Sequence, residues 1–503
     1  MLYLSAMNTL NYHFLKKVTY VYMSLPLLIF FAYWLGSVLA IVYIAMLSYV
    51  LFNTCKYTGT SHQMSPLILQ NPKTFYSLCI GVAVLWCTWS GLGGYFFQTY
   101  DHDGRNPILR DLIFQAWPVT YSNHTVLSYY FGFWLPPALL TKLFAPVLSP
   151  EITFLLGQHL LLLYSIIGIT LLFLLIIYSQ RATGKLAILL CLLFPVFFSG
   201  MDIIGALLLH EEITVDSSHI EWWTSFQYSS LTSCLFWVYN QTIISWLAVM
   251  IFWIERKIQD FGILFVLCFF CGPLPSVGLA LFMAGWILYH GLSLRTKQEM
   301  LILLQQIFSL NNIFTVLFFV PLLLAFFKTN GAAGLHPFAF ELVSFNEWSL
   351  FVLIEFGVIA LLIGHKYYKN ALFLTMLTSL SVLMFFSIGG GDDFPMRASI
   401  PAIIILMLFT LNYILTYSLE NLRGRLLFIC LVFGTVTPLV EMSRGIKNIL
   451  NTGNIRHMHD YIKTFEGKDP HAYPYYNYIT DQENAFFFRY LSKLPPQGRY
   501  DVQ

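Results

Sequence analysis

The stretch TFLLGQHLLLLYSIIGITLLFLLIIY, residues 153–178, contains no Asp, Glu, Lys or Arg. A helix needs about 20 consecutive apolar residues to cross the hydrocarbon core of a bilayer, and this run is longer than that. The rest of the chain has a similar character, because 57% of its 503 residues are hydrophobic and only 10% are charged. So few charges cannot cover a water-soluble surface of this size. The sequence therefore predicts an integral membrane protein.

Similar apolar runs recur along the chain and are separated by short polar segments. Their lengths predict an all-α polytopic membrane protein with about 13 transmembrane helices, in a range of about 11 to 14 because two pairs of runs are closely joined. The predicted spans are residues 18–35, 36–53, 75–97, 153–178, 186–208, 236–254, 261–273, 276–292, 310–327, 349–364, 370–388, 400–418 and 426–442.

Positive charges between these spans fall mainly on one side of the membrane. If the N-terminus is cytoplasmic, the inside loops hold Lys16, Lys17, Lys56, Lys73, Arg181, Lys185, Arg256, Lys257, Arg295, Lys297, Lys366, Lys369, Arg423 and Arg425. The opposite loops hold Arg105, Arg110, Lys142, Lys328 and Arg397. Because cytoplasmic loops are enriched in Lys and Arg, we predict a cytoplasmic N-terminus and an extracytoplasmic C-terminus.

This topology predicts a multi-span domain, residues 1–442, and a small extracytoplasmic C-terminal segment, residues 443–503. The first extracytoplasmic loop, residues 98–152, is large. If its apolar stretch 126–144 crossed the membrane, every later loop would lie on the opposite side and the Lys and Arg residues of those loops would be outside. We therefore interpret this stretch as an interfacial helix. Its aromatic residues are expected at the depth of the lipid headgroups: Tyr129, Tyr130 and Trp134.

The first extracytoplasmic loop opens with Asp101-His102-Asp103, directly after a predicted span. Two carboxylates at this spacing in an extended turn could share a divalent cation, Mg²⁺ or Mn²⁺, or one of them could act as a general base. The alternative is a solvated loop whose carboxylates bind only its own backbone. Apolar positions at helical spacing follow, and they predict an amphipathic helix on the membrane surface with Pro107 in its first turn.

A second polar cluster lies in residues 210–241 and contains His219, Glu221, Trp222 and Trp223. The spacing of its acids and histidines fits no zinc template, and loop carboxylates are more often solvated than metal-bound. The two tryptophans suit a membrane interface, and they also suit stacking on a sugar ring.

A third cluster is GGGDDFPMRASIP, residues 389–401, with Asp392, Asp393 and Arg397. An arginine on the outer face is well suited to grip a phosphate, although it could equally pair with one of the two aspartates alone. Glu355 is the one acid that falls inside a predicted span. An acid at that depth is either functional or bonded to a neighbouring helix.

Taken together, these features resemble the C-type (GT-C) superfamily of integral-membrane glycosyltransferases. The resemblance rests on Asp101-His102-Asp103, on the Arg110-Asp111 pair, and on the interfacial sequence LSYYFGFWLPPALLTKLF. The chain is also similar to a group of bacterial polytopic membrane proteins through three stretches: YDHDGRNPILRDLIFQAWP, HIEWWTSFQYSS and DDFPMRASIP.

The resemblance implies an inverting transfer of a sugar from a polyprenyl phosphate or diphosphate to a glycan, lipid or protein acceptor. This reaction would take place on the outer face of a bacterial plasma membrane. Asp101 would act as the base, and Asp103 would position the acceptor or a cation. The donor phosphate would be held by Arg397, Arg105 and Arg110, and the remaining substrate contacts would come from His219, Glu221, Trp222, Trp223, Asp392 and Asp393.

Two other functions remain open at this stage. A transporter or flippase of lipid-linked sugars usually shows internal repeats and ionisable groups in mid-membrane, whereas here the charges gather on one face. A polymerase or ligase of surface polysaccharide would use the same substrate class. A nucleic-acid partner is not expected, because the net charge is only +2 and the Lys and Arg residues form no basic cluster.

Overall fold

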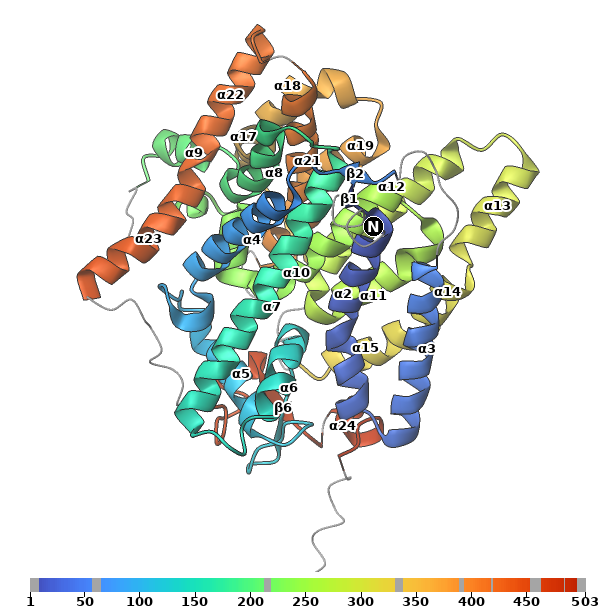
Figure 1. The fold of residues 1–503 in the computed structure, drawn as a ribbon, viewed down its shortest axis with the longest axis vertical. Helices are drawn as coiled ribbons and strands as arrows, with labels where there is room; N and C mark the ends of the chain where they lie inside the picture. The colour runs from blue at the N-terminus through green and yellow to red at the C-terminus, as the bar shows by residue number, and fades with distance from the viewer. Residues whose placement is uncertain are drawn as a thin grey trace, which may run out of the picture.

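The structure is a computed structural model that describes residues 9–56, 65–211, 219–330, 338–388, 393–417, 419–452, 463–483 and 485–494. These residues form a helical bundle (Figure 1). Nine described helices are long and apolar enough to cross a membrane: Tyr12–Trp34, Ser37–Cys55, Pro150–Ser179, Lys185–Leu208, Leu231–Glu255, Pro273–Ser293, Leu310–Phe327, Phe345–Tyr367 and Leu422–Asn451. The chain is therefore a multi-pass helical membrane protein.

The helices follow one another with short connections. The first half contains α2 (Tyr12–Trp34), α3 (Ser37–Cys55), α4 (Pro72–Trp89), α5 (His102–Phe114), α6 (Leu135–Lys142), α7 (Pro150–Ser179), α8 (Lys185–Phe197), α9 (Asp202–Leu208) and α10 (Leu231–Glu255). The second half contains α11 (Phe261–Cys271), α12 (Pro273–Leu292), α13 (Lys297–Ile307), α14 (Leu310–Phe314), α15 (Val320–Phe327), α17 (Phe345–Val352), α18 (Val358–Tyr367), α19 (Ala371–Val382), α20 (Asp393–Ala398), α21 (Ile400–Thr416), α22 (Leu422–Gly434), α23 (Val436–Thr452) and α24 (Phe486–Tyr490).

Strands are short and form three antiparallel pairs among the described residues. The pairs are β1 (Thr9–Leu10) with β2 (Leu67–Ile68), β3 (Thr125–Leu127) with β6 (Ile479–Asp481), and β4 (Ala339–Phe340) with β5 (Phe386–Ser387). The β3–β6 pair joins the first long loop to the C-terminal segment, because Thr125 pairs with Asp481 and Leu127 with Ile479.

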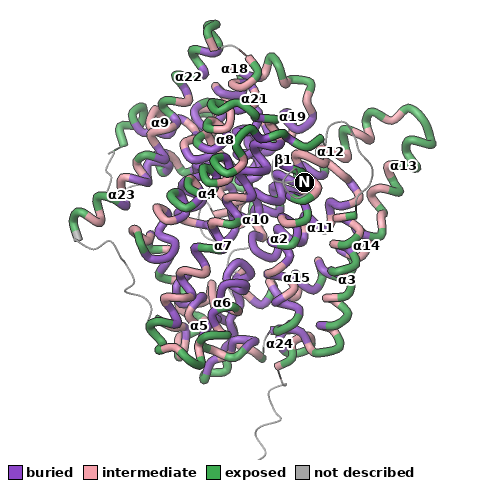
Figure 2. Tube along the Cα trace, in the orientation of Figure 1, coloured by how far each residue is buried: buried purple, intermediate pink, exposed green. Residues whose placement is uncertain are grey.

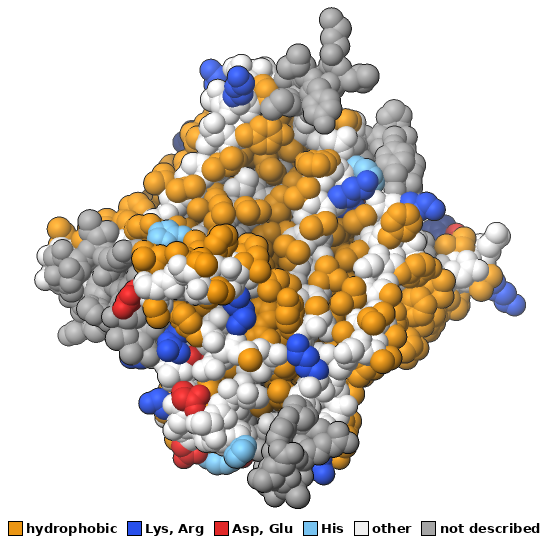
Figure 3. Space-filling view, turned by 60° about the horizontal axis from the view of Figure 1, so that its bottom comes forward, with side chains coloured by type: hydrophobic (Ala, Val, Ile, Leu, Met, Phe, Trp, Pro, Cys, Tyr) orange, Lys and Arg blue, Asp and Glu red, His pale blue; other side chains and the backbone are white. Residues whose placement is uncertain are grey.

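The apolar side chains divide between a packed centre and an outer surface. In the most apolar 18-residue stretch of α10, 94% of the residues are buried, whereas in the corresponding stretch of α3 only 22% are buried. Figure 2 shows the buried residues concentrated around α10 in the middle of the bundle. Hydrophobic side chains also cover a large part of the face in Figure 3, where charged side chains are few and the acidic ones lie mainly at the lower left. A bilayer, rather than water, is the solvent that tolerates such a surface.

Every predicted span overlaps a helix, because a backbone that crosses a bilayer must satisfy its hydrogen bonds within the protein. Three predicted spans correspond to shorter apolar helices, Ile258–Cys271, Ala371–Phe385 and Ile400–Thr416. The predicted span 75–97 corresponds to α4, which ends at Trp89. The count of 13 membrane crossings stays a prediction.

The two ends of the bundle have different contacts. At one end, Lys16 pairs with Glu255 at 2.8 Å and Arg181 donates to the carbonyl of Ser65 at 2.7 Å. At the other end, α5, α6, β6 and α24 lie together (Figure 1). The residues in these contacts were all predicted on the same side of the membrane, and the structure brings them together. Which end of the bundle faces the cytoplasm stays a prediction.

Details of the first long loop differ from the prediction. Helix α5 begins at His102, so Pro107 lies inside the helix and not in a separate surface helix that starts there. Pro107 and most of α5 are buried, and Trp134 is 0% exposed and donates to the hydroxyl of Tyr239 at 2.9 Å. An apolar face predicts burial but does not say whether lipid or protein provides it. Here protein buries these residues, and the depth of Trp134 in the membrane stays a prediction.

The boundary predicted between residues 442 and 443 lies inside a helix. Helix α23 runs without a break from Val436 to Thr452. Beyond it, the described residues 463–483 pack onto the first long loop through the β3–β6 pair. The C-terminal segment is thus part of the loop structure in which Asp101 lies.

Candidate functional site

The three polar clusters of the sequence meet at one cavity of about 120 Å³. Asp101 comes from the start of α5, His219 and Trp222 from the connection before α10, and Asp393 and Arg397 from α20. The full lining consists of Tyr100, Asp101, His219, Trp222, Gln227, Ser229, Ser233, Cys234, Trp237, Val238, Asp393, Met396 and Arg397. Segments separated by up to about 300 residues therefore form one site.

Asp101 stands immediately before α5, and Arg105 follows one helical turn later. Residues four apart lie on the same helix face, so Nη2 of Arg105 reaches Oδ2 of Asp101 at 2.6 Å. The Arg105 side chain is only 4% exposed, whereas that of Asp101 is 29% exposed. The guanidinium also lies 5.4 Å from the ring centre of Tyr239. This arrangement fixes the orientation of the Asp101 carboxylate at the cavity.

Asp103 does not line this cavity. Two residues along a helix rotate the side chain by about 200°, and the Asp103 side chain is 62% exposed with Oδ1 3.6 Å from Nζ of Lys463. The two carboxylates of the Asp-x-Asp motif thus point in different directions. Across the described residues, no group of three or more His, Cys, Asp or Glu side chains is arranged to hold a metal ion.

Arg397 and Asp393 form a pair with the same spacing as Arg105 and Asp101. Its Nη2 lies 2.8 Å from Oδ1 of Asp393, four residues earlier, and its Nη1 donates to the hydroxyl of Tyr130 at 3.1 Å. Burial acts to lower the pKa of Arg397, but the carboxylate of Asp393 and the neighbouring Tyr130 raise it above its ordinary value. The guanidinium therefore stays charged.

Both arginines keep a buried N–H group without an acceptor among the described residues. These groups are Nη1 of Arg105 and Nε of Arg397. A buried donor without a partner is costly, because it has lost its hydrogen bonds to water. Arg397 lines the cavity, so an anion there could accept from its Nε, whereas Arg105 is not among the lining residues. Neither Arg105 nor Arg397 is thus fully satisfied by its aspartate.

His219 lies between two buried carboxylates. Its Nδ1 is 3.7 Å from Oε2 of Glu221, and its Nε2 is 3.5 Å from Oε1 of Glu441. Glu221 does not line the cavity, but it accepts from Oγ of Ser233 at 2.5 Å and from Nε2 of Gln227 at 3.0 Å. Glu221 therefore positions residues that do line it.

Aromatic side chains form another part of the wall. Trp222 is 47% exposed, and Trp237 packs edge-on against Tyr100 with ring centres 5.0 Å apart. Trp223 instead turns into the protein, where its ring packs onto Gly205 so closely that a Cβ there would lie 2.3 Å away. The two consecutive tryptophans thus have separate roles, and only Trp222 faces the cavity.

Arg110 lies away from the cavity. Its Nη1 pairs with Oδ1 of Asp111 at 2.9 Å, and its guanidinium lies 5.5 Å from the ring centre of Phe114. Asp111 is 0% exposed and also accepts from Tyr121. The Arg110–Asp111 pair therefore belongs to the packing of the loop. Asp392 lies outside the described residues.

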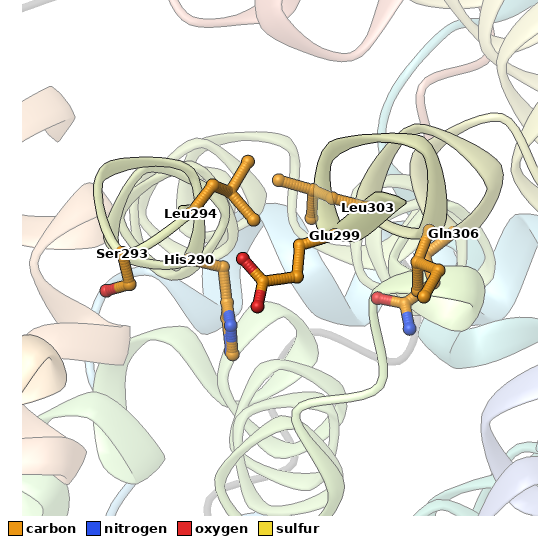
Figure 4. Close-up of a pocket in the computed structure, with 7 residues that line it drawn as sticks. His290, Ser293, Leu294, Glu299, Leu303 and Gln306 are labelled. Atoms are coloured by element: carbon orange, nitrogen blue, oxygen red, sulfur yellow. The ribbon is translucent and has the colours of Figure 1, made fainter. Parts of the chain in front are cut away.

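A second cavity, of about 300 Å³, lies between α12 and α13 (Figure 4). The carboxylate of Glu299 accepts from the backbone N–H groups of Arg295 and Thr296, at 2.8 and 3.2 Å, and these bonds lower its pKa. Glu299 thus caps the start of α13, and the polar groups here serve the helix end. We regard the cavity at Asp101 as the functional site.

Sequence reasoning missed the wall residue Trp237. It also missed Glu441, which accepts from Nε1 of Trp237 at 2.9 Å and pairs with Arg444 at 3.1 Å, although neither of these two charged residues lines the cavity. One usable signal was present: Asp101 with Arg105 and Asp393 with Arg397 are both Asp-x-x-x-Arg, a spacing that pairs charges on a helix. No protein-family model matches the chain, and comparisons with curated proteins and with solved structures find no match.

Proposed function

We propose that the chain is a membrane glycosyltransferase that takes a sugar from a polyprenyl phosphate or diphosphate. The observation that carries this proposal is the convergence of Asp101, Arg397 and Trp222 on one cavity at one end of a membrane bundle. A carboxylate, a cationic group and an aromatic face are what the reaction needs: a base, a phosphate ligand and a platform for a sugar ring. The lipid tail of such a donor would remain among the membrane helices.

In this proposal, Asp101 accepts the proton of the acceptor hydroxyl as that oxygen attacks the anomeric carbon. The bond from the sugar to the phosphate breaks at the same time, and the phosphate leaves with the electron pair. Arg397 then offsets the charge on the departing phosphate through its buried N–H groups. Arg105 keeps the carboxylate of Asp101 in place.

A divalent cation fits the cavity poorly. The two carboxylates that line it, Asp101 and Asp393, are each paired with an arginine at 2.6 and 2.8 Å. Divalent cations prefer several oxygen ligands, and here the nearest partners of these oxygens are already cationic. The arginines can supply the positive charge that the phosphate requires, so we route no step through a metal.

The test is genetic and uses a matched pair of aspartates. A strain that lacks the gene is complemented with the wild-type chain, with Asp101→Asn or with Asp103→Asn, and the surface glycans are compared at equal membrane levels of protein. We expect loss of the glycan with Asp101→Asn and near-normal glycan with Asp103→Asn, because only Asp101 lines the cavity. Normal glycan with Asp101→Asn would reject this base.

We also propose that the cavity faces the outside of a bacterial plasma membrane, with the N-terminus in the cytoplasm. Ser122 and Thr183 are both exposed; Ser122 contacts Glu466 of the C-terminal segment, and Thr183 lies in the connection between α7 and α8. Seven of the eight native cysteines are buried and Cys55 is half-buried, so background labelling should be low. An impermeant thiol reagent should label Ser122→Cys and spare Thr183→Cys in intact cells. The reverse pattern would invert the topology.

A flippase of lipid-linked sugars is the second candidate, and one observation favours it. Asp202 and Glu355 form a buried carboxyl pair within candidate membrane spans, and such acids are common in transporters. The two functions differ in their product. With purified protein in proteoliposomes, a flippase leaves a polyprenyl-phosphate sugar intact, whereas a glycosyltransferase consumes it when an acceptor is present.

A further inference from the structure

Two candidate membrane helices are interrupted, and the interruptions face each other. The span Lys185–Leu208 breaks between α8 and α9, and the span Phe345–Tyr367 contains a π-helical turn, Leu353–Gly357. The N–H of Met201 donates to the carbonyl of Ile354 at 3.2 Å, which joins the two interruptions. Irregular backbone inside membrane helices often accompanies functional sites, and in transporters it can accompany an ion or proton site.

Each interruption carries a carboxylic acid. Asp202 begins α9 and Glu355 lies in the π-helical turn, and they are 1% and 3% exposed. Their side chains lie close together, because a Cβ on Gly200, two residues before Asp202, would lie 2.3 Å from Oε2 of Glu355. Oδ2 of Asp202 also accepts from Oγ of Ser199 at 3.1 Å and from Oγ1 of Thr437 at 2.7 Å, while Oε1 of Glu355 accepts from Nε1 of Trp223 at 3.2 Å.

No cation neutralises this pair within the described part of the chain, where neither acid forms an ion pair with Lys, Arg or His. The ionisable groups that act on the pair are Glu221 and, beside Glu355, Tyr228. The charged residues of the helices packed around the pair have other contacts. In α23, Glu441 contacts His219 and Arg444 lies over the ring of Trp237. In α22, Arg423 and Arg425 lie in the first turn, whereas the end that packs near the pair is the last residue, Gly434, on Ser199.

Two carboxylates can hydrogen-bond to each other only if one of them carries a proton, because an ionised carboxylate is an acceptor alone. Oδ1 of Asp202 is buried and receives no donor from the described residues. A proton on Glu355 would give Oδ1 of Asp202 a hydrogen-bond donor, and it would also remove one of two uncompensated buried charges. We propose that Asp202 and Glu355 form a binding site for a single proton inside the membrane-spanning bundle.

The site lies directly behind the wall of the cavity. Trp223 donates to Glu355, and the preceding residue, Trp222, lines the cavity. The bound proton therefore holds α9 to the π-helical turn and supports the turn that carries both tryptophans. This inference does not depend on the glycosyltransferase proposal, because it concerns the protonation of two residues outside the cavity lining.

The experiment is infrared spectroscopy of the purified full chain in lipid nanodiscs at neutral pH. The wild-type chain should show the carbonyl band of a protonated carboxylic acid, with a shift to lower frequency in D₂O. The band should be lost in Glu355→Gln and in Asp202→Asn, because an amide supplies the hydrogen bond without a titratable proton. Glu347→Gln is the control, since Glu347 begins the same span and accepts from Thr224; it should keep the band.

A second measurement does not rely on the spectra of variants. A proton held by the folded protein and released on unfolding makes stability fall as the pH rises. The Tm of the wild-type chain should therefore fall from neutral to alkaline pH, and the Tm of Glu355→Gln should fall less. A wild-type spectrum without the band at neutral pH, or a band that survives in both single variants, overturns the proposal.

Discussion

Removal of the Asp111 carboxylate should release the C-terminal segment from the first long loop. Asp111 is fully buried and accepts four hydrogen bonds: from Arg110 at 2.9 Å, from Tyr121 at 2.9 Å, from Oγ1 of Thr464 at 2.6 Å and from the N–H of Phe465 at 3.0 Å. The last two cross from the loop to a segment more than 350 residues away in sequence. In Asp111→Ala, these buried donors lose their acceptor.

The expected magnitude follows from these contacts. A buried donor that loses its acceptor costs about 1 to 3 kcal/mol, and several donors share this carboxylate, so its removal should cost about 3 to 5 kcal/mol. With a factor of ten for each 1.4 kcal/mol, local opening of residues 463–468 should become more frequent by roughly a hundredfold to several thousandfold. The pKa of Tyr121 is raised by burial and by Asp111 beside it, so this hydroxyl stays a neutral donor at physiological pH.

Hydrogen–deuterium exchange of the protein in nanodiscs measures this opening directly, through the backbone amide of Phe465. Arg110→Ala is the matched control: the Arg110 side chain is 25% exposed, and its loss leaves the bonds from Tyr121, Thr464 and Phe465 to Asp111 in place, so residues 463–468 should stay attached to the loop. Exchange at residues 463–468 that is no faster in Asp111→Ala than in Arg110→Ala would refute this reasoning.

Two further predictions concern the start of α5. Gly104→Ala should destabilise the chain by about 1 to 3 kcal/mol, because a Cβ at residue 104 would lie 2.3 Å from the hydroxyl of Tyr478. An unchanged Tm would contradict this prediction and would show that α5 and the C-terminal segment can move apart at little cost. The double variant Asp101→Asn with Arg105→Gln should reduce glycan synthesis no more than Asp101→Asn alone, because the effects of mutating residues that act as one unit do not add. A double variant whose loss equals the product of the two single losses would show that Arg105 acts independently of Asp101.

The sequence predicts the helices of this protein better than their surroundings. Apolar runs reveal membrane helices because a bilayer leaves the backbone few other conformations. The same pattern does not distinguish lipid from protein as the partner of an apolar face, which is why Trp134 and α5 were placed at the membrane surface but are buried. The start of α5 was missed because Asp101-His102-Asp103 was interpreted as an extended turn, whereas it continues directly into the helix.

The candidate site could be predicted in its parts but not as a whole. Charges and aromatics after apolar runs were enough to select Asp101, Trp222 and Arg397. That they share a cavity depends on the packing of α5, α10 and α20, and a single sequence holds no direct signal for contacts so distant along the chain. The network around His219 was partly missed for the same reason, because Glu441 is contributed by α23.

The two Asp–Arg pairs give the proposed reaction a physical logic. Asp101, Arg105, Asp393 and Arg397 sum to no net charge, so in the resting state neither arginine is fully available to an anion. When Asp101 accepts a proton, its negative charge disappears and Arg105 loses its ionic partner. Positive charge is thereby released at the moment when the departing phosphate becomes more negative. Electrostatic stabilisation that appears only in the transition state is the kind that accelerates a reaction.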